Sequence, residues 1–287
     1  MIVDCHVNVW EDRQMLPLFL EQSRIARPGG FAPRADPETV VQAMAGVDRA
    51  IVFSLRYKDS VGVDGDDEVT ARTVALAPEK IIGFAAVDPR RPDAMDLLVH
   101  ATRDLKLQGV KFGPIYNGVS VLDPRMVPIY EYLVRNNLPL TMHMGTTFGQ
   151  NAPVELGRPV DVDTIAARYP DLKMIMAHMG HPWYEECIVV ARKNPNVYCE
   201  VSALYYRPWQ YYNILIAAQE YTIADRDKIF FGTDFPFTTV EDSLAGLRAI
   251  NRQVEGTNLP RVSDDTIERI IHSDPLAHWW HGGYPGS

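Results

Sequence analysis

Two short apolar stretches, LPLTMHMG at residues 138–145 and KMIMAHMG at residues 173–180, decide the fold prediction. Each ends in a histidine and a glycine, and the amphipathic residues 162–169 between them predict a helix. Apolar runs without strict period-two alternation are typical of strands buried on both faces. The two stretches therefore predict parallel strands joined by a helix, with a polar side chain at the carboxyl end of each strand.

The same unit recurs along the chain, because further helices are predicted over residues 93–105, 124–136 and 182–193. Eight such repeats predict an α/β fold, a single (β/α)8 TIM barrel with the active site at the carboxyl ends of its strands. An open doubly wound sheet is the alternative, but no GxGxxG sequence follows a predicted strand. The predicted strands are Ile2 to His6, Ala50 to Ser54, Ile81 to Val87, Gly109 to Gly113, Leu138 to Gly145, Lys173 to Gly180, Val197 to Ala203 and Lys228 to Phe235.

Two segments interrupt the regular spacing of one domain over residues 1–287. Residues 11–36 contain Arg-Pro-Gly-Gly and predict a long loop, which after the first strand would lie over the barrel mouth. Residues 278–287 are rich in glycine and aromatic residues and predict a tail outside the barrel. Trp279 and Trp280 in that tail suit either packing or a contact between subunits. We expect a homo-oligomer, either a dimer or a tetramer.

Composition restricts the partners and the compartment. The chain is 46% hydrophobic and 23% charged, which is typical of a globular protein. A net charge of −9 disfavours nucleic acid and anionic membranes, so a small-molecule substrate is expected. Three cysteines without CxxC spacing, and no signal-like or membrane-spanning run, predict a cytoplasmic protein.

Polar side chains stand at the ends of four predicted strands: His6, His143, His178 and Asp234. In a barrel these ends surround one pocket, so the four side chains should converge. Mixed imidazole and carboxylate donors suit Zn²⁺, with Mn²⁺ or Fe²⁺ as alternatives. We expect His6, His143 and Asp234 to bind one divalent metal, zinc by preference. His178 would be a further ligand or a general acid/base.

Several further residues are candidates for the same pocket. Asp4 could complete the metal ligands or hydrogen-bond a neighbouring loop, whereas Asn8 would fix substrate or water. His181 is expected to contact substrate, and Arg158 either binds a substrate carboxylate or forms a loop ion pair. Tyr116 is one of several loop aromatics that favour a flat or unsaturated substrate, although such residues also build oligomer interfaces.

Taken in order, five stretches of the chain resemble the amidohydrolase superfamily. The resemblance is to its amidohydrolase-related branch of decarboxylases, hydratases and lactone hydrolases, and it extends from the first strand to about residue 270. The stretches are Asp4 to Asn8, Gly109 to Pro114, Leu138 to Gly145, Pro170 to Gly180 and Phe231 to Pro236.

The chain departs from that family at two places. Asn8 stands where the family usually has a second histidine, which leaves metal dependence open, and Gly113 stands where many relatives have histidine. Lys111 corresponds to a lysine that is carboxylated and bridges two metals in binuclear relatives. Because Asn8 replaces a ligand, we favour an internal Lys111 paired with a barrel carboxylate.

The resemblance implies two competing reactions. The first is metal-dependent hydrolysis of a small carboxylated ester or lactone, in which Asp234 and the metal activate water and His178 binds the carbonyl oxygen. The second is non-oxidative decarboxylation, or hydration, of an aromatic or unsaturated carboxylic acid, with Asp234 or His178 delivering the proton. A non-catalytic metabolite-binding barrel is the third and least favoured interpretation.

Overall fold

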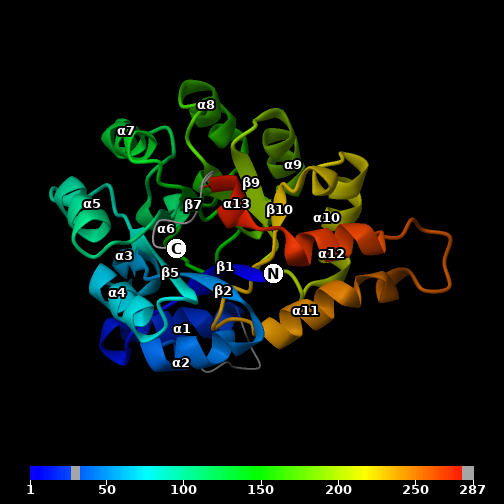
Figure 1. Ribbon diagram of the computed structural model, residues 1–287, viewed down its shortest axis with the longest axis horizontal. Helices are drawn as coiled ribbons and strands as arrows, with labels where there is room; N and C mark the ends of the chain where they lie inside the picture. The colour runs from blue at the N-terminus through cyan, green and yellow to red at the C-terminus, as the bar shows by residue number, and fades with distance from the viewer. Residues whose placement is uncertain (27–32, 280–287) are drawn as a thin grey trace.

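The computed structural model describes residues 1–26 and 33–279. Its centre is an eight-stranded parallel sheet (Figure 1). The sheet closes because backbone N–H groups of Cys5 and Asn8 donate to the carbonyls of Phe231 and Phe235. The predicted (β/α)8 TIM barrel is confirmed. In spatial order the strands are β1 (Val3–Asn8), β2 (Arg49–Phe53), β5 (Ile81–Ala86), β6 (Val110–Phe112), β7 (Leu140–Met142), β8 (Met174–Met176), β9 (Val197–Glu200) and β10 (Ile229–Phe230).

Helices surround the strands as an outer ring (Figure 1). The four predicted helices are present within two residues of their expected ends, although a 3-10 turn replaces the start of the one over residues 124–136. The helices are α1 (Pro17–Ala26), α2 (Pro37–Ala43), α3 (Lys58–Val61), α4 (Asp67–Leu76), α5 (Ala94–Arg103), α6 (Pro114–Asn117), α7 (Val127–Arg135), α8 (Val160–Arg168), α9 (Tyr184–Lys193), α10 (Pro208–Glu220), α11 (Val240–Arg248), α12 (Asp264–His272) and α13 (Pro275–Trp279).

β7, β8 and β10 end earlier than predicted, whereas β1 continues past His6 to Asn8. β7 stops before His143, and β8 stops before His178. His178 has a φ of 57° and Asp234 a φ of 67°, in the left-handed region that non-glycine residues seldom adopt. At both residues the backbone is no longer that of a strand, so their side chains do not follow the alternation of strand side chains between the two faces of the sheet. Local turns set their direction instead.

The segment over residues 11–36 is not a simple loop, contrary to the prediction. It contains a 3-10 turn (Asp12–Gln14) and then α1, whose Phe19 lines the pocket described below. Its far end is held by the indole Nε1 of Trp10, which donates to the carbonyl of Pro33 at 2.7 Å. Residues 27–32 of the expected loop lie outside the described residues.

A short excursion of the chain after β2, over residues 56–64, forms two strands and a helix that were not predicted. β3 (Arg56–Tyr57) and β4 (Val63–Asp64) pair antiparallel, and α3 connects them. The amide of Asn117 in α6 donates to the carbonyl of Arg56 at 3.0 Å and joins the excursion to the next part of the barrel rim. The excursion brings Tyr57 to the carboxyl ends of the strands.

The amino ends of the strands are covered by α13, which crosses the centre of the barrel in Figure 1. The side chain of Trp279 is fully buried, with its ring 6.0 Å from Phe84 and 6.1 Å from Phe230 between centroids. The burial of Trp279 in the chain's own core supports packing, and not a subunit contact, for this residue. Trp280 and the rest of the predicted tail lie outside the described residues.

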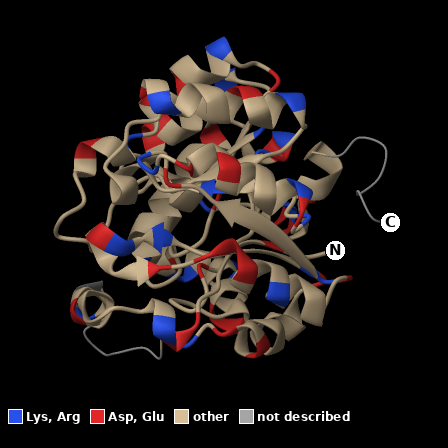
Figure 2. Cartoon of the chain, turned by 90° about the vertical axis from the view of Figure 1, so that its left-hand side faces the viewer, with Lys and Arg blue, Asp and Glu red and all other residues tan. Residues whose placement is uncertain are grey.

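Basic and acidic residues are interspersed over the helices (Figure 2). Cys5, Cys187 and Cys199 are buried free thiols. Across residues 1–26 and 33–279, no helix has both the length and the apolar character needed to cross a membrane.

Candidate active site

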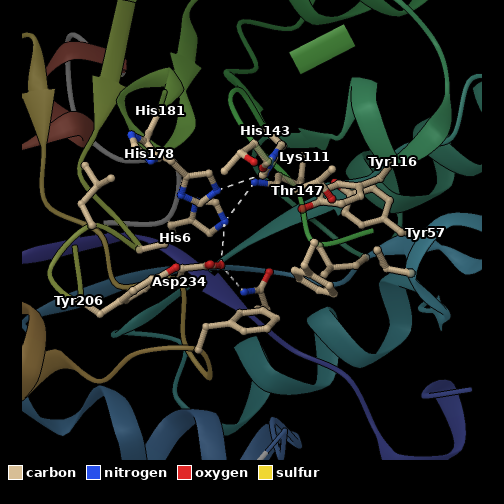
Figure 3. Close-up of a pocket in the computed structure, with 18 of the residues that line it drawn as sticks. His6, Tyr57, Lys111, Tyr116, His143, Thr147, His178, His181, Tyr206 and Asp234 are labelled. Carbon is tan, nitrogen blue, oxygen red and sulfur yellow. Dashed lines mark hydrogen bonds and ion pairs between the residues drawn. The ribbon is translucent and has the colours of Figure 1, made fainter. Parts of the chain in front are cut away.

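A cavity of about 290 Å³ opens at the carboxyl ends of the strands (Figure 3). This volume lies at the lower end of the range for pockets that bind small molecules, which is about 300–1,000 Å³. Titratable side chains form its floor and aromatic rings form much of its wall. The lining residues are His6, Asn8, Phe19, Leu55, Tyr57, Val61, Lys111, Tyr116, His143, Thr146, Thr147, Phe148, His178, His181, Ala203, Leu204, Tyr206, Arg207, Asp234 and Phe237.

His6 is held by a carboxylate that the sequence analysis missed. Its Nδ1 lies 2.9 Å from Oε1 of Glu200, a fully buried residue at the end of β9. Burial lowers the pKa of His6 well below its usual value, and Lys111 and His143 lower it further, so the ring is neutral. Nδ1 therefore donates to Glu200, and Nε2 presents a lone pair to the cavity.

His143 and His178 face each other across the floor. Nε2 of His143 donates to the carbonyl of Thr146 at 3.0 Å, and Nδ1 of His178 lies 2.8 Å from Oγ of Ser202 and 3.3 Å from its carbonyl. When the Ser202 hydroxyl donates to Glu200, Nδ1 of His178 donates to Ser202; when the hydroxyl donates to His178, the imidazole proton is on Nε2. The inner nitrogens, His143 Nδ1 and His178 Nε2, lie 3.1 Å apart. They form a hydrogen bond when the proton of His178 is on Nε2, and present two facing lone pairs when it is on Nδ1.

In the second tautomer the two facing lone pairs can both bind a cation. An additional proton is disfavoured there, because burial lowers the pKa of His143 to about 3 and that of His178 well below its usual value, with smaller effects of neighbouring cationic groups. Three neutral imidazoles whose outer nitrogens are held by protein groups are also the usual form of metal-binding histidines. The floor therefore fits a metal cation.

Asp234 and Lys111 complete the floor. Oδ1 of Asp234 accepts from the amide of Asn8 at 2.8 Å and lies 3.4 Å from Nε2 of His6. Burial raises the pKa of Asp234 to about 7, although Asn8 and Lys111 oppose the shift. Nζ of Lys111 lies 3.1 Å from the same His6 nitrogen. Among the described residues the buried lysine thus contacts an imidazole and pairs with no carboxylate, contrary to the prediction.

Among the described residues, the ligand atoms of His6, His178 and Glu200 lie within 4.8 Å of one another. Oε1 of Glu200 already accepts from His6, from the backbone N–H of His178 and from Ser202, and Oε2 accepts a 2.6 Å bond from the N–H of Ser202. Glu200 therefore orients the histidines. The donors that face the cavity are His6, His143, His178 and Asp234, with Lys111 competing for the lone pair of His6.

Asp4 does not reach the cavity, contrary to its predicted place among the ligands. Its carboxylate accepts bonds from the N–H of His6 at 3.0 Å and from the N–H and hydroxyl of Thr233 at 3.0 and 2.7 Å. The residue is fully buried. Asp4 joins the first strand to the turn after the last one, which is the alternative structural role considered above.

Three predicted substrate contacts lie on the cavity wall, namely Asn8, His181 and Tyr116, and their contact with substrate stays a prediction. Arg158 does not line the cavity. Its guanidinium pairs with Glu186 in α9 and lies over the ring of Trp183 at 5.8 Å. The structure therefore supports the loop ion pair for Arg158.

Tyr57 is a wall residue that sequence reasoning missed. Its ring stacks on Tyr116 at 4.7 Å, and Tyr116 in turn lies 4.6 Å from the ring of His143. Its buried hydroxyl has no hydrogen-bond partner among the described residues. A Cβ at Gly113 would lie 2.5 Å from Cζ of Tyr57, so the glycine makes room for this ring. Glycine at position 113, where many relatives have histidine, was the one sequence signal that a large side chain packs against this position.

The whole barrel and its site agree with one family. The Amidohydrolase family matches residues 3–275, and the chain belongs to it. A curated relative, the fluG protein of Emericella nidulans, is 25% identical over 147 residues, which cover 46% of this chain and 17% of that protein. The chain therefore spans a small part of that relative's length.

Solved structures share the fold at low sequence identity. An uncharacterised TIM-barrel protein of Bordetella bronchiseptica has a TM-score of 0.72 at 22% identity, covering 94% of this chain and 95% of its own. The 5-carboxyvanillate decarboxylase of Sphingomonas paucimobilis scores 0.64 at 15% identity, with 94% and 96% covered. A dihydroxybenzoic acid decarboxylase of a Polaromonas species, with bound manganese and 2-nitroresorcinol, scores 0.63 at 16% identity, with 94% of each chain covered.

Proposed function

We propose that this protein is a metal-dependent lyase that decarboxylates a small aromatic or unsaturated carboxylic acid. One observation carries the proposal: a floor of neutral imidazoles, a carboxyl group and a buried ammonium group lies between stacked aromatic walls. The decarboxylases among the similar structures support the same reaction, which was the alternative in the sequence analysis. Hydrolysis of an ester or lactone, the first expectation, is not confirmed.

The floor fits one divalent metal, which His6, His143, His178 and Asp234 would hold. When bound, such an ion polarises substrate oxygens and stabilises developing negative charge. Zinc was the expected ion, and a similar decarboxylase binds manganese, so both are included in the test.

The chain's own residues position the substrate and move the proton. Rings of Tyr57 and Tyr116 provide a flat apolar wall for the substrate ring. The carboxyl group of Asp234, held at Oδ1 by Asn8, donates its proton to the substrate carbon that bears the carboxylate. The bond from that carbon to the carboxylate then breaks, its electron pair stays with the ring, and CO₂ leaves. Asp234 regains a proton from solvent.

The test measures CO₂ release from hydroxybenzoates and unsaturated acids by protein loaded with Mn²⁺ or Zn²⁺, with lactones in a parallel hydrolysis assay. In D₂O the product should carry deuterium at the carbon that lost the carboxylate. Asp234→Asn should lower the rate at least 100-fold, which is within the range for a general acid. Arg158→Gln, an exposed change outside the cavity, is the matched control and should retain activity.

Each outcome decides between the two reactions. CO₂ release that depends on Asp234 supports the lyase. Hydrolysis of a lactone without CO₂ release from any acid would overturn the lyase in favour of the hydrolase. Full decarboxylation by Asp234→Asn would remove Asp234 from the proposed step.

A further inference from the structure

One cation on the cavity wall has no acidic partner within residues 1–26 and 33–279. Arg207 follows β9 and lines the cavity, and its recorded hydrogen bond is a 3.3 Å contact from Nη1 to the carbonyl of Ala203. Its guanidinium lies over the ring of Tyr206 at 4.4 Å. No carboxylate of the described chain is within ion-pair distance of it. By contrast, Arg56 pairs with Asp67 at 2.8 Å.

The surroundings of Arg207 add positive potential to that wall. Arg207 is the N-cap of α10, a 13-residue helix with no acidic residue in its first turn and no side-chain cap. The amino end of a helix carries unsatisfied N–H groups and partial positive charge. His181, on the same cavity, is kept neutral because burial, and then the nearby Arg207, lowers the pKa of its ring to about 4. Its Nδ1 is buried and has no hydrogen-bond partner among the described residues.

We infer that Arg207 forms a second anion subsite, which selects substrates that carry a second carboxylate in addition to the one at the cavity floor. The inference rests on the proposed function and narrows its substrate class to dicarboxylic aromatic or unsaturated acids. The planar guanidinium can bind a carboxylate through two parallel hydrogen bonds, and Tyr206 holds it in place from one face. The sequence analysis assigned this role to Arg158, but Glu186 already neutralises that side chain.

The test is a binding measurement, so that it does not depend on turnover. Benzoate, phthalate, isophthalate and terephthalate are titrated into the metal-loaded protein by calorimetry, and NMR follows whether each ligand stays intact. We expect at least one dicarboxylate to bind ten or more times more tightly than benzoate. In Arg207→Gln that preference should fall to within twofold.

Two further variants serve as controls. Arg158→Gln should keep the full preference, because its side chain lies outside the cavity. Arg207→Lys should keep part of the preference, because it retains the charge but loses the planar fork. Circular dichroism melts establish that each variant is folded before titration.

The results separate this inference from the proposed function. No tenfold preference in the wild type, or a preference that survives in Arg207→Gln, would overturn the subsite even if CO₂ release were found. A preference that depends on Arg207 supports the subsite even if no acid is decarboxylated.

Discussion

Substituting Gly113 by alanine tests how tightly the aromatic wall is packed. The new Cβ would lie 2.5 Å from Cζ and 2.7 Å from Cε1 of Tyr57, closer than any real contact. Tyr57 cannot simply retreat, because its other face stacks on Tyr116, which lies against His143. Overpacking of this kind costs about 1–3 kcal/mol. We expect Gly113→Ala to lower the free energy of unfolding by about 2 kcal/mol.

The same substitution in two further backgrounds identifies the cause. In Tyr57→Phe the ring carbons remain, so Gly113→Ala should cost about as much as in the wild type. In Tyr57→Leu the ring is absent, and the cost should fall to below about 0.5 kcal/mol, a coupling of at least 1 kcal/mol. Tyr57→Phe by itself should not destabilise the protein, because the lost hydroxyl has no partner among the described residues.

The assay is urea unfolding of metal-free protein, followed by tryptophan fluorescence and by circular dichroism. Equal m values across the variants are needed for the free energies to be compared. An equal cost of Gly113→Ala in all three backgrounds would refute the reasoning, because the contact with the Tyr57 ring could not then be its source.

Three other predictions concern the floor and the surface. Glu200→Gln should weaken metal binding about 10–100-fold, because it removes the carboxylate that orients His6. Competition titration against a chelator measures the metal affinity. An unchanged affinity would exclude the orienting role of Glu200. The pKa of His143 is lowered from 6.5 to about 3 by burial, so between these values the unfolded chain binds a proton that the folded chain does not. This residue should therefore lower the free energy of unfolding by up to about 1.4 kcal/mol for each pH unit of acidification. With EDTA present and pH varied from 6.5 to 4, the free energy of unfolding of His143→Asn should fall less steeply with decreasing pH than that of the wild type. Equal slopes in the two proteins would contradict the assignment. Arg158→Gln should change the free energy of unfolding by less than about 1 kcal/mol, because its ion pair with Glu186 is exposed, and a larger loss in urea would argue against this.

The fold was predictable because its pattern is carried by local sequence. Apolar runs alternate with amphipathic segments, and His6, His143, His178 and Asp234 stand where such runs end. The exact direction of the last two was not predictable, because left-handed backbone at both residues departs from strand alternation.

The rest of the site depends on contacts between distant residues. Glu200 and Lys111 are each a charged residue inside an apolar predicted strand. Such a residue requires a buried partner, but the sequence does not indicate which residue that partner is. Nothing in the sequence distinguished Arg158 from Arg207 as the cavity arginine. That distinction depends on Glu186, a residue 28 positions after Arg158, which only the folded loop brings close.

The bonds between Asp4 and Thr233 span 229 positions of the chain. During synthesis at about 5–20 residues per second, the first strand emerges from the ribosome roughly 10–50 s before its closing neighbour exists. Throughout that interval the nascent chain has His6 without Asp234, and the edge of β1 that will meet β10 is unpaired. The pocket is therefore among the last parts of the protein to be made, and a prematurely terminated chain cannot hold it.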